Sequence, residues 1–236
     1  MNVPGSERLI VVVGPSGAGK DSVLQAWLRG LAPADAPCRV RRVITRSPDP
    51  HGEDHEATDA ATFARSLASG CFIFHWTAHG LHYGVRPAAL APLAAGRWVV
   101  LNGSRAHLPQ LRMQAPDALV VEVTAPAAVR ADRLAHRARE DAPAVAARLA
   151  RDAPASGASL VVVNDGDLEA AVARLHRWWR ARSVVDAGAA AEVVRAGGWP
   201  RRAAVASSPG TVFVPGSGVV SGAVVAPSPD PFPCRS

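Results

Sequence analysis

The stretch Gly14-Pro15-Ser16-Gly17-Ala18-Gly19-Lys20 decides the fold of this chain. It matches the pattern G-x-x-x-x-G-K, whose glycines let the backbone curve tightly enough to point several N–H groups at phosphate oxygens. The run 9–13 before it is short, apolar and rich in valine, as in a buried strand of a parallel sheet. After it, apolar residues recur at helical spacing at Val23, Leu24, Trp27, Leu28 and Leu31. Because the pattern requires this strand and this helix, we predict a loop that binds the phosphates of a nucleotide.

Lys20 stands apart because every other residue among the 26 lysines and arginines is an arginine. A lysine ammonium is a compact charge on a flexible stem, so it can follow the β- and γ-phosphates of a nucleotide, whereas a planar guanidinium would fit that space poorly. We therefore predict that Lys20 is catalytic and that ATP is the phosphoryl donor. The predicted donor site comprises Gly14, Pro15, Ser16, Gly17, Ala18, Gly19, Lys20, Asp21 and Ser22.

The residue after Lys20 departs from the usual pattern. It is Asp21, where phosphate loops of this kind place a serine or threonine for Mg²⁺. Ser22 comes next and can take that role, or the metal can be held through water, or Asp21 itself can bind or orient it. We predict a Mg²⁺ site at Asp21 and Ser22, and the sequence leaves these alternatives open.

Composition favours a small anionic partner over nucleic acid or membrane. The chain of 236 residues carries a formal net charge of +6, but its arginines are scattered and form no aromatic-basic stripe or helix-turn-helix pattern. No apolar run reaches the roughly 18–20 residues needed to cross a bilayer. Charged Glu7 and Arg8 lead directly into the first strand, which is not the layout of a signal peptide. We therefore expect a cytoplasmic protein.

Strand-like and helix-like segments alternate along the rest of the chain. Strands are predicted at 39–44, 71–76, 97–101, 119–123 and 160–163, and helices at 59–69, 125–139, 142–151 and 168–182. This alternation predicts an α/β fold with a mainly parallel sheet flanked by helices.

The composition changes near residue 183. We predict one domain over 1–182 and a flexible, low-complexity extension over 183–236, which is rich in Ala, Gly, Pro, Ser and Val. The valines of the extension leave open a strand that docks on a partner. The sequence does not decide the oligomeric state, and a homodimer is one of the states that it leaves open.

Beyond the phosphate loop, the chain resembles the guanylate kinase family over residues 8–180. The resembling segments are Thr45-Arg46, Gly52-Glu53, Tyr83-Gly84 and Val163-Asn164-Asp165, with arginines Arg133, Arg137 and Arg148. The resemblance implies a P-loop NTPase fold with a small lid and a substrate-binding subregion. It also implies that Asn164 lies near adenine, and that the three arginines are catalytic lid residues that neutralise the moving phosphoryl group.

The resemblance to guanylate kinase fails where guanine would be recognised. That family places acids before the tryptophan of one strand and at the end of another, whereas this chain has His75 before Trp76 and Asn102-Gly103-Ser104. Neither replacement supplies a carboxylate for the N1–H and amino group of guanine. An unpaired buried donor costs on the order of 1–3 kcal/mol, so GMP is not the expected acceptor.

The chain resembles more closely the ribose 1,5-bisphosphate phosphokinases of phosphonate degradation. The features that carry this resemblance are Gly19-Lys20-Asp21-Ser22, Thr45-Arg46, residues 52–56, His75-Trp76, residues 79–84 and Asn102-Gly103-Ser104-Arg105. It implies that ATP phosphorylates ribose 1,5-bisphosphate to 5-phosphoribosyl 1-diphosphate. The predicted substrate-binding residues are Thr45, Arg46, Glu53, Asp54, His55, His75, Tyr83, Asn102 and Ser104. Another small-molecule or nucleotide kinase, and a binding module without catalysis, are the alternatives.

Overall fold

The computed structural model describes residues 2–48, 53–136 and 157–195. The chain divides into two units, Met1–Arg182 and Ser183–Ser236, and the fold described below is that of the first. In the described part of the chain, no helix combines the length and the apolar character that a membrane span requires. The predicted helix at 142–151, the lid residues Arg137 and Arg148, and most of the predicted extension lie outside the described residues.

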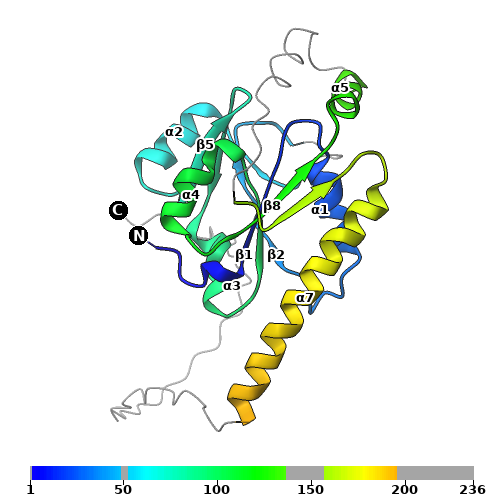
Figure 1. The fold of residues 1–236 in the computed structure, drawn as a ribbon. Coiled ribbons are helices and arrows are strands. Elements are labelled where there is room, and N and C mark those ends of the chain that lie inside the picture. The colour runs from blue at the N-terminus through cyan, green and yellow to red at the C-terminus, as the bar shows by residue number, and fades with distance from the viewer. Residues whose placement is uncertain (1, 49–52, 137–156, 196–236) are drawn as a thin grey trace, which may run out of the picture. The chain divides into compact units, whose positions relative to one another are not determined.

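A five-stranded parallel sheet forms the centre of the unit (Figure 1). Its strands, in spatial order, are β2 (Cys38–Arg39), β7 (Val99–Asn102), β1 (Leu9–Val13), β8 (Leu119–Thr124) and β9 (Leu160–Val163). All five residues of β1 are buried, as expected for a strand covered on both faces. The predicted α/β fold with a mainly parallel sheet is confirmed. Because parallel strands share one direction, the loops after β1, β7, β8 and β9 gather at one edge of the sheet.

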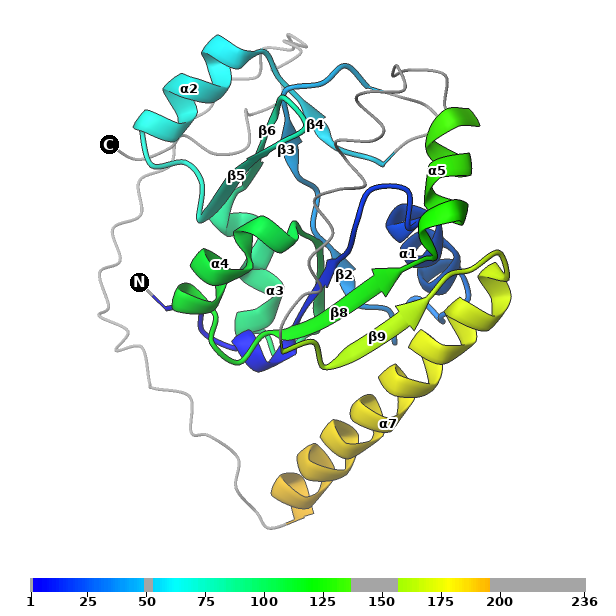
Figure 2. The same ribbon diagram turned by 45° about the horizontal axis from the view of Figure 1, so that its top comes forward.

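Helices cover both faces of this sheet (Figure 2). On one face, Ile10 and Val12 pack in a core with Trp27 of α1 (Lys20–Arg29) and Trp179 of α7 (Leu168–Arg195). On the other, Leu9 and Val11 pack with residues of α3 (Ala91–Ala94), α4 (Leu108–Gln114) and the short 3₁₀ helix Pro87–Leu90. Another 3₁₀ helix, Arg105–His107, leads into α4. A further 3₁₀ turn, Ser6–Arg8, leads into β1, and α5 (Ala127–His136) follows β8.

A second, smaller sheet lies beside the first and bears one more helix. Its order is β4 (Glu56–Ala57), β3 (Val43–Ile44), β6 (Leu81–Val85) and β5 (Phe74–Ala78), with β3 antiparallel to β6 and parallel to β4. The helix is α2 (Ala60–Ala68), and its N-cap Asp59 accepts a hydrogen bond of 2.8 Å from the Thr62 N–H. This confirms the predicted helix start at Asp59.

Two strand predictions are wrong in detail. The predicted strand 39–44 is two short strands in different sheets, because the chain crosses from one sheet to the other at Val40–Arg42 and turns the Arg42 side chain inward. The strand predicted at 71–76 runs instead over 74–78 and pairs with β6. The turn that joins β5 to β6 is His79-Gly80, where both residues have positive φ, 54° and 71°, as a tight hairpin turn requires.

Candidate functional site

The phosphate loop joins β1 to α1 and depends on its glycines. Gly14 has a φ of 150°, and a Cβ at that position would overlap the carbonyl oxygen of Val123. Gly19 has a φ of 80°, and a Cβ there would overlap the side-chain nitrogen of Asn164. The loop can therefore lie against β8 and Asn164 only with glycine at these two places. This close packing leaves the backbone N–H groups at the start of α1 directed at one edge of the sheet.

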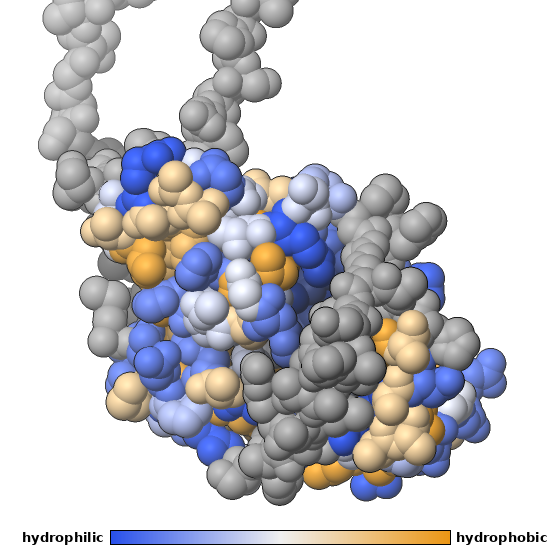
Figure 3. All heavy atoms as spheres, turned by 90° about the horizontal axis from the view of Figure 1, so that it is seen from above, coloured by the Kyte–Doolittle hydropathy of each residue, from blue (hydrophilic) through white to orange (hydrophobic). Residues whose placement is uncertain are grey.

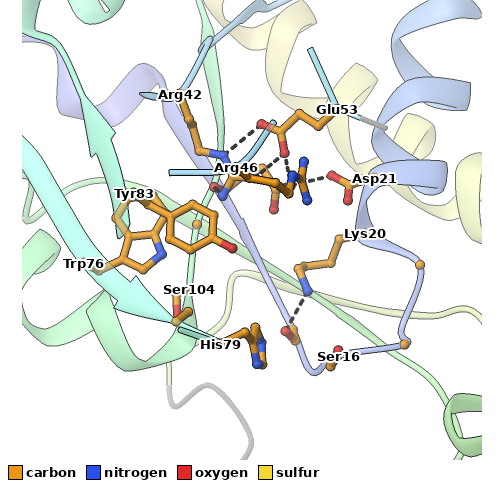
Figure 4. Close-up of a pocket in the computed structure, with 16 residues that line it drawn as sticks. Ser16, Lys20, Asp21, Arg42, Arg46, Glu53, Trp76, His79, Tyr83 and Ser104 are labelled. Carbon is orange, nitrogen blue, oxygen red and sulfur yellow. Dashed lines mark hydrogen bonds and ion pairs between the residues drawn. The ribbon is translucent and has the colours of Figure 1, made fainter. Parts of the chain in front are cut away.

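Lys20, the first residue of α1, folds back over the loop (Figure 4). Its Nζ donates hydrogen bonds to the carbonyl oxygens of Gly14, at 2.9 Å, and Pro15, at 3.2 Å. The ammonium group is thus held above the loop, and a phosphate bound there can replace weak carbonyl contacts with stronger charge-assisted ones.

A polar cavity of about 180 Å³ opens beside Lys20, between the phosphate loop and the second sheet. Seen from above in Figure 3, hydrophilic side chains border a hollow on this face of the molecule. The cavity is lined by Gly14, Ser16, Gly17, Gly19, Lys20, Asp21, Arg42, Arg46, Glu53, Trp76, Ala78, His79, Tyr83, Asn102, Gly103 and Ser104. One end is therefore built from the loop and the other from β5, β6 and the segment after β7.

A connected set of hydrogen bonds runs across this cavity (Figure 4). The side-chain amide of Asn102, at the end of β7, donates to Asp21 Oδ1 at 2.5 Å and to Glu53 Oε2 at 3.2 Å. Arg42 Nε donates to Glu53 Oε1 at 2.8 Å, and Arg42 also contacts Glu53 Oε2 through its NH2 group. A third bond of 2.8 Å runs from Arg42 NH1 to the carbonyl oxygen of Asn102. Asn102 therefore links the first turn of α1 to the ion pair of Arg42 and Glu53.

Aromatic rings form the wall of the cavity farther from the loop. Trp76 and Tyr83 are stacked, with ring centres 5.3 Å apart and planes at 2°. Burial raises the pKa of the Tyr83 phenol above its usual range, so the hydroxyl stays protonated and can donate a hydrogen bond. Behind them, His107 stacks on Trp76 at 5.1 Å, and burial lowers its pKa.

A second hollow, of about 420 Å³, lies on the other side of the phosphate loop. It is lined by Gly17, Gly19, Ser22, Asp132, Arg133, Asn164, Gly166 and Leu168. Arg133 of α5 donates to the carbonyl oxygen of Asn164 at 3.1 Å, and Asn164 Nδ2 donates to the carbonyl oxygen of Ala18 at 2.8 Å. These contacts tie α5 and the end of β9 to the loop.

The structure brings most of the predicted site residues together, in two groups. Lys20, Asp21, Arg46, Glu53, Tyr83, Asn102 and Ser104 line the polar cavity, whereas Ser22, Arg133 and Asn164 line the second hollow. Asp21 and Ser22, predicted as a pair of metal ligands, therefore face different spaces. Among the described residues, no cluster of three or more His, Cys, Asp or Glu side chains is arranged to hold a metal ion.

Four predicted substrate-binding residues do not line the cavity. The Thr45 hydroxyl accepts a bond of 2.9 Å from the backbone N–H of His82, in the second sheet. Asp54 is exposed and paired with Arg41 at 3.1 Å. His55 is buried, and its ring nitrogens contact the carbonyl oxygens of Glu53 and Arg46, so it shapes the loop that presents those residues. His75 is exposed and alternates along β5 with Trp76.

Arg42, Trp76 and His79 line the cavity although none of them is among the predicted site residues. A signal for Arg42 was present, because Val40 and Ile44 lie two residues before and after it and are both buried. Residues two apart along an extended segment share one side, so this spacing marks Arg42 as an inward-facing charge.

Comparisons with known proteins show which chains this one is similar to. A family model described as guanylate kinase matches residues 6–182. A ribose 1,5-bisphosphate phosphokinase PhnN from Acidiphilium cryptum is 48% identical over 169 residues, which cover 72% of this chain and 90% of that protein. A bifunctional ribose 1,5-bisphosphokinase-thymidine phosphorylase from Azorhizobium caulinodans is 47% identical over 163 residues, which cover 69% of this chain and 24% of that protein. The structure of a guanylate kinase from Anaplasma phagocytophilum matches with a TM-score of 0.55 at 20% identity, over 74% of this chain and 85% of that one. At this identity the structural likeness shows the fold alone.

Proposed function

The chain belongs to the guanylate kinase family and, within it, to the ribose 1,5-bisphosphate phosphokinases, and on this premise we propose that it transfers the γ-phosphoryl group of ATP to ribose 1,5-bisphosphate. The products are ADP and 5-phosphoribosyl 1-diphosphate, and the reaction belongs to phosphonate degradation. The observation that carries the proposal is the polar cavity that joins Lys20 to Arg46, Tyr83 and Ser104. It offers a place for a donor phosphate at one end and for a phosphorylated sugar at the other.

The phosphate loop fits the triphosphate of ATP. A Cβ at Gly14 or Gly19 would fill the space that the loop needs, and the Lys20 ammonium already lies against two of its carbonyl groups. Arg133 and Asn164 lie on the opposite side of the loop and would line the nucleoside end of the donor. Arg137 and Arg148 would join Arg133 in the lid.

Mg²⁺ fits this site through oxygen donors and water. Asp21 offers a half-exposed carboxylate beside Lys20, and Mg²⁺ keeps several waters and shares phosphate oxygens in sites of this kind. Asp21 would hold the ion or one of its waters, while Ser22, on the other side of the loop, would contribute only after a rearrangement. Bound there, the ion supplies positive charge to the β- and γ-phosphates.

The end of the cavity farther from the phosphate loop would bind the anionic acceptor without recognising a nucleobase. Arg46 Nε is buried and has no hydrogen-bond partner among the described residues, so a substrate phosphate can satisfy it. The Tyr83 hydroxyl and Ser104 would contact the sugar or its phosphates. The carboxylates of Asp21 and Glu53 accept hydrogen bonds from Asn102 or Arg42, which does not favour recognition of guanine.

The transfer needs positioning and charge neutralisation rather than a strong base. An oxygen of the 1-phosphate, already ionised, attacks the γ-phosphorus of ATP and forms a new P–O bond. The bond between that phosphorus and the β–γ bridging oxygen breaks, and its electron pair leaves with ADP. Lys20 and the lid arginines would stabilise the charge that spreads over the transferred group.

A coupled assay of ADP release tests this function, with ribose 1,5-bisphosphate and GMP as parallel acceptors. We expect turnover of the bisphosphate and little of GMP. Robust turnover of GMP with none of the bisphosphate would overturn the proposal. Lys20→Ala is the control for the donor site and should abolish activity while leaving the fold intact by circular dichroism.

A further inference from the structure

We propose that Arg42 is a specificity-determining residue of the acceptor site: its guanidinium covers the aromatic wall on which a nucleobase would stack, and so reserves the site for a sugar phosphate without a base. This inference rests on the proposed function and adds to it the residue that excludes nucleotides. It starts from an arginine that neither the phosphate loop nor the lid uses.

Arg42 is held rigidly inside the cavity wall. Its side chain is 8% exposed and that of its partner Glu53 is 2% exposed. Three of its N–H groups are used, two by the Glu53 carboxylate and one by the carbonyl oxygen of Asn102 at 2.8 Å. A guanidinium that is fixed on two sides in this way cannot swing aside at little cost to admit a larger ligand.

The fixed guanidinium lies against the aromatic pair. Its central carbon is 5.0 Å from the ring centre of Tyr83 and 5.8 Å from that of Trp76, which are the distances of cation–π contacts. His107 stacks on Trp76 at 5.1 Å, and the Trp76 residue as a whole is only 8% exposed. Protein side chains therefore already occupy much of the ring surface in this wall.

A nucleobase needs an open aromatic face and free hydrogen-bonding groups, and both are already engaged by protein side chains in this wall. Bases bind proteins by stacking on aromatic faces and by hydrogen bonds to their edges. Here Arg42 lies over the faces, and Glu53 is engaged by Arg42 and Asn102. A ribose carrying phosphates needs neither an open ring face nor a free carboxylate, because hydroxyl and phosphate donors and acceptors suffice. Arg42 thus makes one site poor for GMP and leaves it suitable for a sugar bisphosphate.

The test measures dissociation constants for ribose 1,5-bisphosphate and GMP by calorimetry, without ATP, in wild type and variants. Arg42→Met combined with Glu53→Gln removes both charges, because removing Arg42 alone would leave a buried carboxylate unpaired. Arg42→Lys keeps the charge but loses the planar fork. Arg41→Met is the matched control, since Arg41 precedes Arg42 in the chain and its side chain is 61% exposed.

We expect the ratio of the GMP constant to the bisphosphate constant to fall by at least about tenfold in the double variant and to fall less in Arg42→Lys. It should stay within about twofold of wild type in Arg41→Met. A partly unfolded preparation lowers the binding stoichiometry but not this ratio. A ratio within about twofold of wild type in both Arg42 variants would overturn the inference. Binding of the bisphosphate by wild type without its turnover would instead overturn the proposed function.

Discussion

Asp21 follows Lys20 at a position where a serine or threonine usually stands. The contacts of its side chain explain why an aspartate suits this position. Its carboxylate accepts a hydrogen bond of 2.5 Å from Asn102 and lies 4.0 Å from Arg39. A serine hydroxyl lacks both the charge and the extra bond length that reach Asn102. Sequence reasoning found Asp21 and Asn102 separately but had no means of pairing them, because the pairing depends on β1 and β7 lying side by side.

We predict that Asp21→Asn lowers kcat by about tenfold or more, because it removes a charge-assisted hydrogen bond beside the donor phosphates. Thermal stability should change little, since the Asp21 side chain is 53% exposed. Steady-state kinetics and a thermal melt measure both effects. Asp35→Asn, an exposed aspartate in the loop after α1, is the control. Equal kinetics in Asp21→Asn and wild type would show that the carboxylate has no part in the reaction.

His107 links residue chemistry to pH. Burial lowers the pKa of its imidazole, so the unfolded chain binds a proton more readily than the folded one. The stability that His107 supports is therefore complete above about pH 6.5 and declines as the pH falls through that value. We predict that His107→Phe, which keeps a ring against Trp76, flattens this acid-side decline. Urea unfolding across the range measures it, and an identical decline in the variant would contradict the assignment.

At the scale of elements, the sequence predicted a helix or strand best where that element carries its own periodic pattern of apolar residues. The run 9–13 and the helix after the loop were found because each carries its own apolar pattern. The segment 39–44 was read as one strand because it is extended throughout, yet its two ends pair with different sheets. Which neighbour a short strand chooses is set by long-range packing that local pattern does not encode.

The ion pair of Glu56 on β4 with Arg86, directly after β6, fastens an edge of the second sheet. Arg86 contacts both carboxylate oxygens, at 2.6 and 3.2 Å, and also lies over the Phe72 ring. Its hydrogen bonds lower the pKa of Glu56. Because both side chains are more than a third exposed, solvent screening limits the stabilisation to about 0.5–1 kcal/mol.

We predict that Arg86→Met lowers the free energy of unfolding by about 0.5–1 kcal/mol at neutral pH. A glutamate with a depressed pKa contributes stability above its ordinary value near 4.3, and this contribution is lost as the pH falls through the lower folded pKa. The difference between variant and wild type should therefore shrink in acid. Urea titrations at neutral and acid pH measure it, and a difference that does not depend on pH would contradict the account.

At the scale of the whole molecule, the fold brings four strand ends to one edge, and each delivers part of the site. The start of α1, after β1, supplies Lys20, and the end of β7 supplies Asn102. Helix α5, after β8, supplies Arg133, and Asn164 directly follows β9. Lys20 was predicted from the phosphate-loop pattern, and Asn102 and Asn164 from the resemblance to known families. From the second sheet, sequence reasoning predicted Tyr83, but Trp76 and His79 were not among the predicted site residues, because their approach to the cavity depends on the pairing of β5 with β6.

The composition of 183–236 predicts an extension that the reaction does not need. We expect a chain ended after Arg195, the last residue of α7, to keep kcat/KM within about twofold of the full chain. Side-by-side kinetics of the two chains measure this. A large loss in the shortened chain would show that the extension takes part in binding, assembly or folding.

The identity of the product tests the central claim most directly. With ATP and ribose 1,5-bisphosphate as the only substrates, ³¹P nuclear magnetic resonance should show the loss of the sugar 1-phosphate signal. A diphosphate attached to the sugar should appear in step with ADP, while the 5-phosphate signal persists. ATP hydrolysis to ADP and free phosphate without a sugar diphosphate would contradict the account.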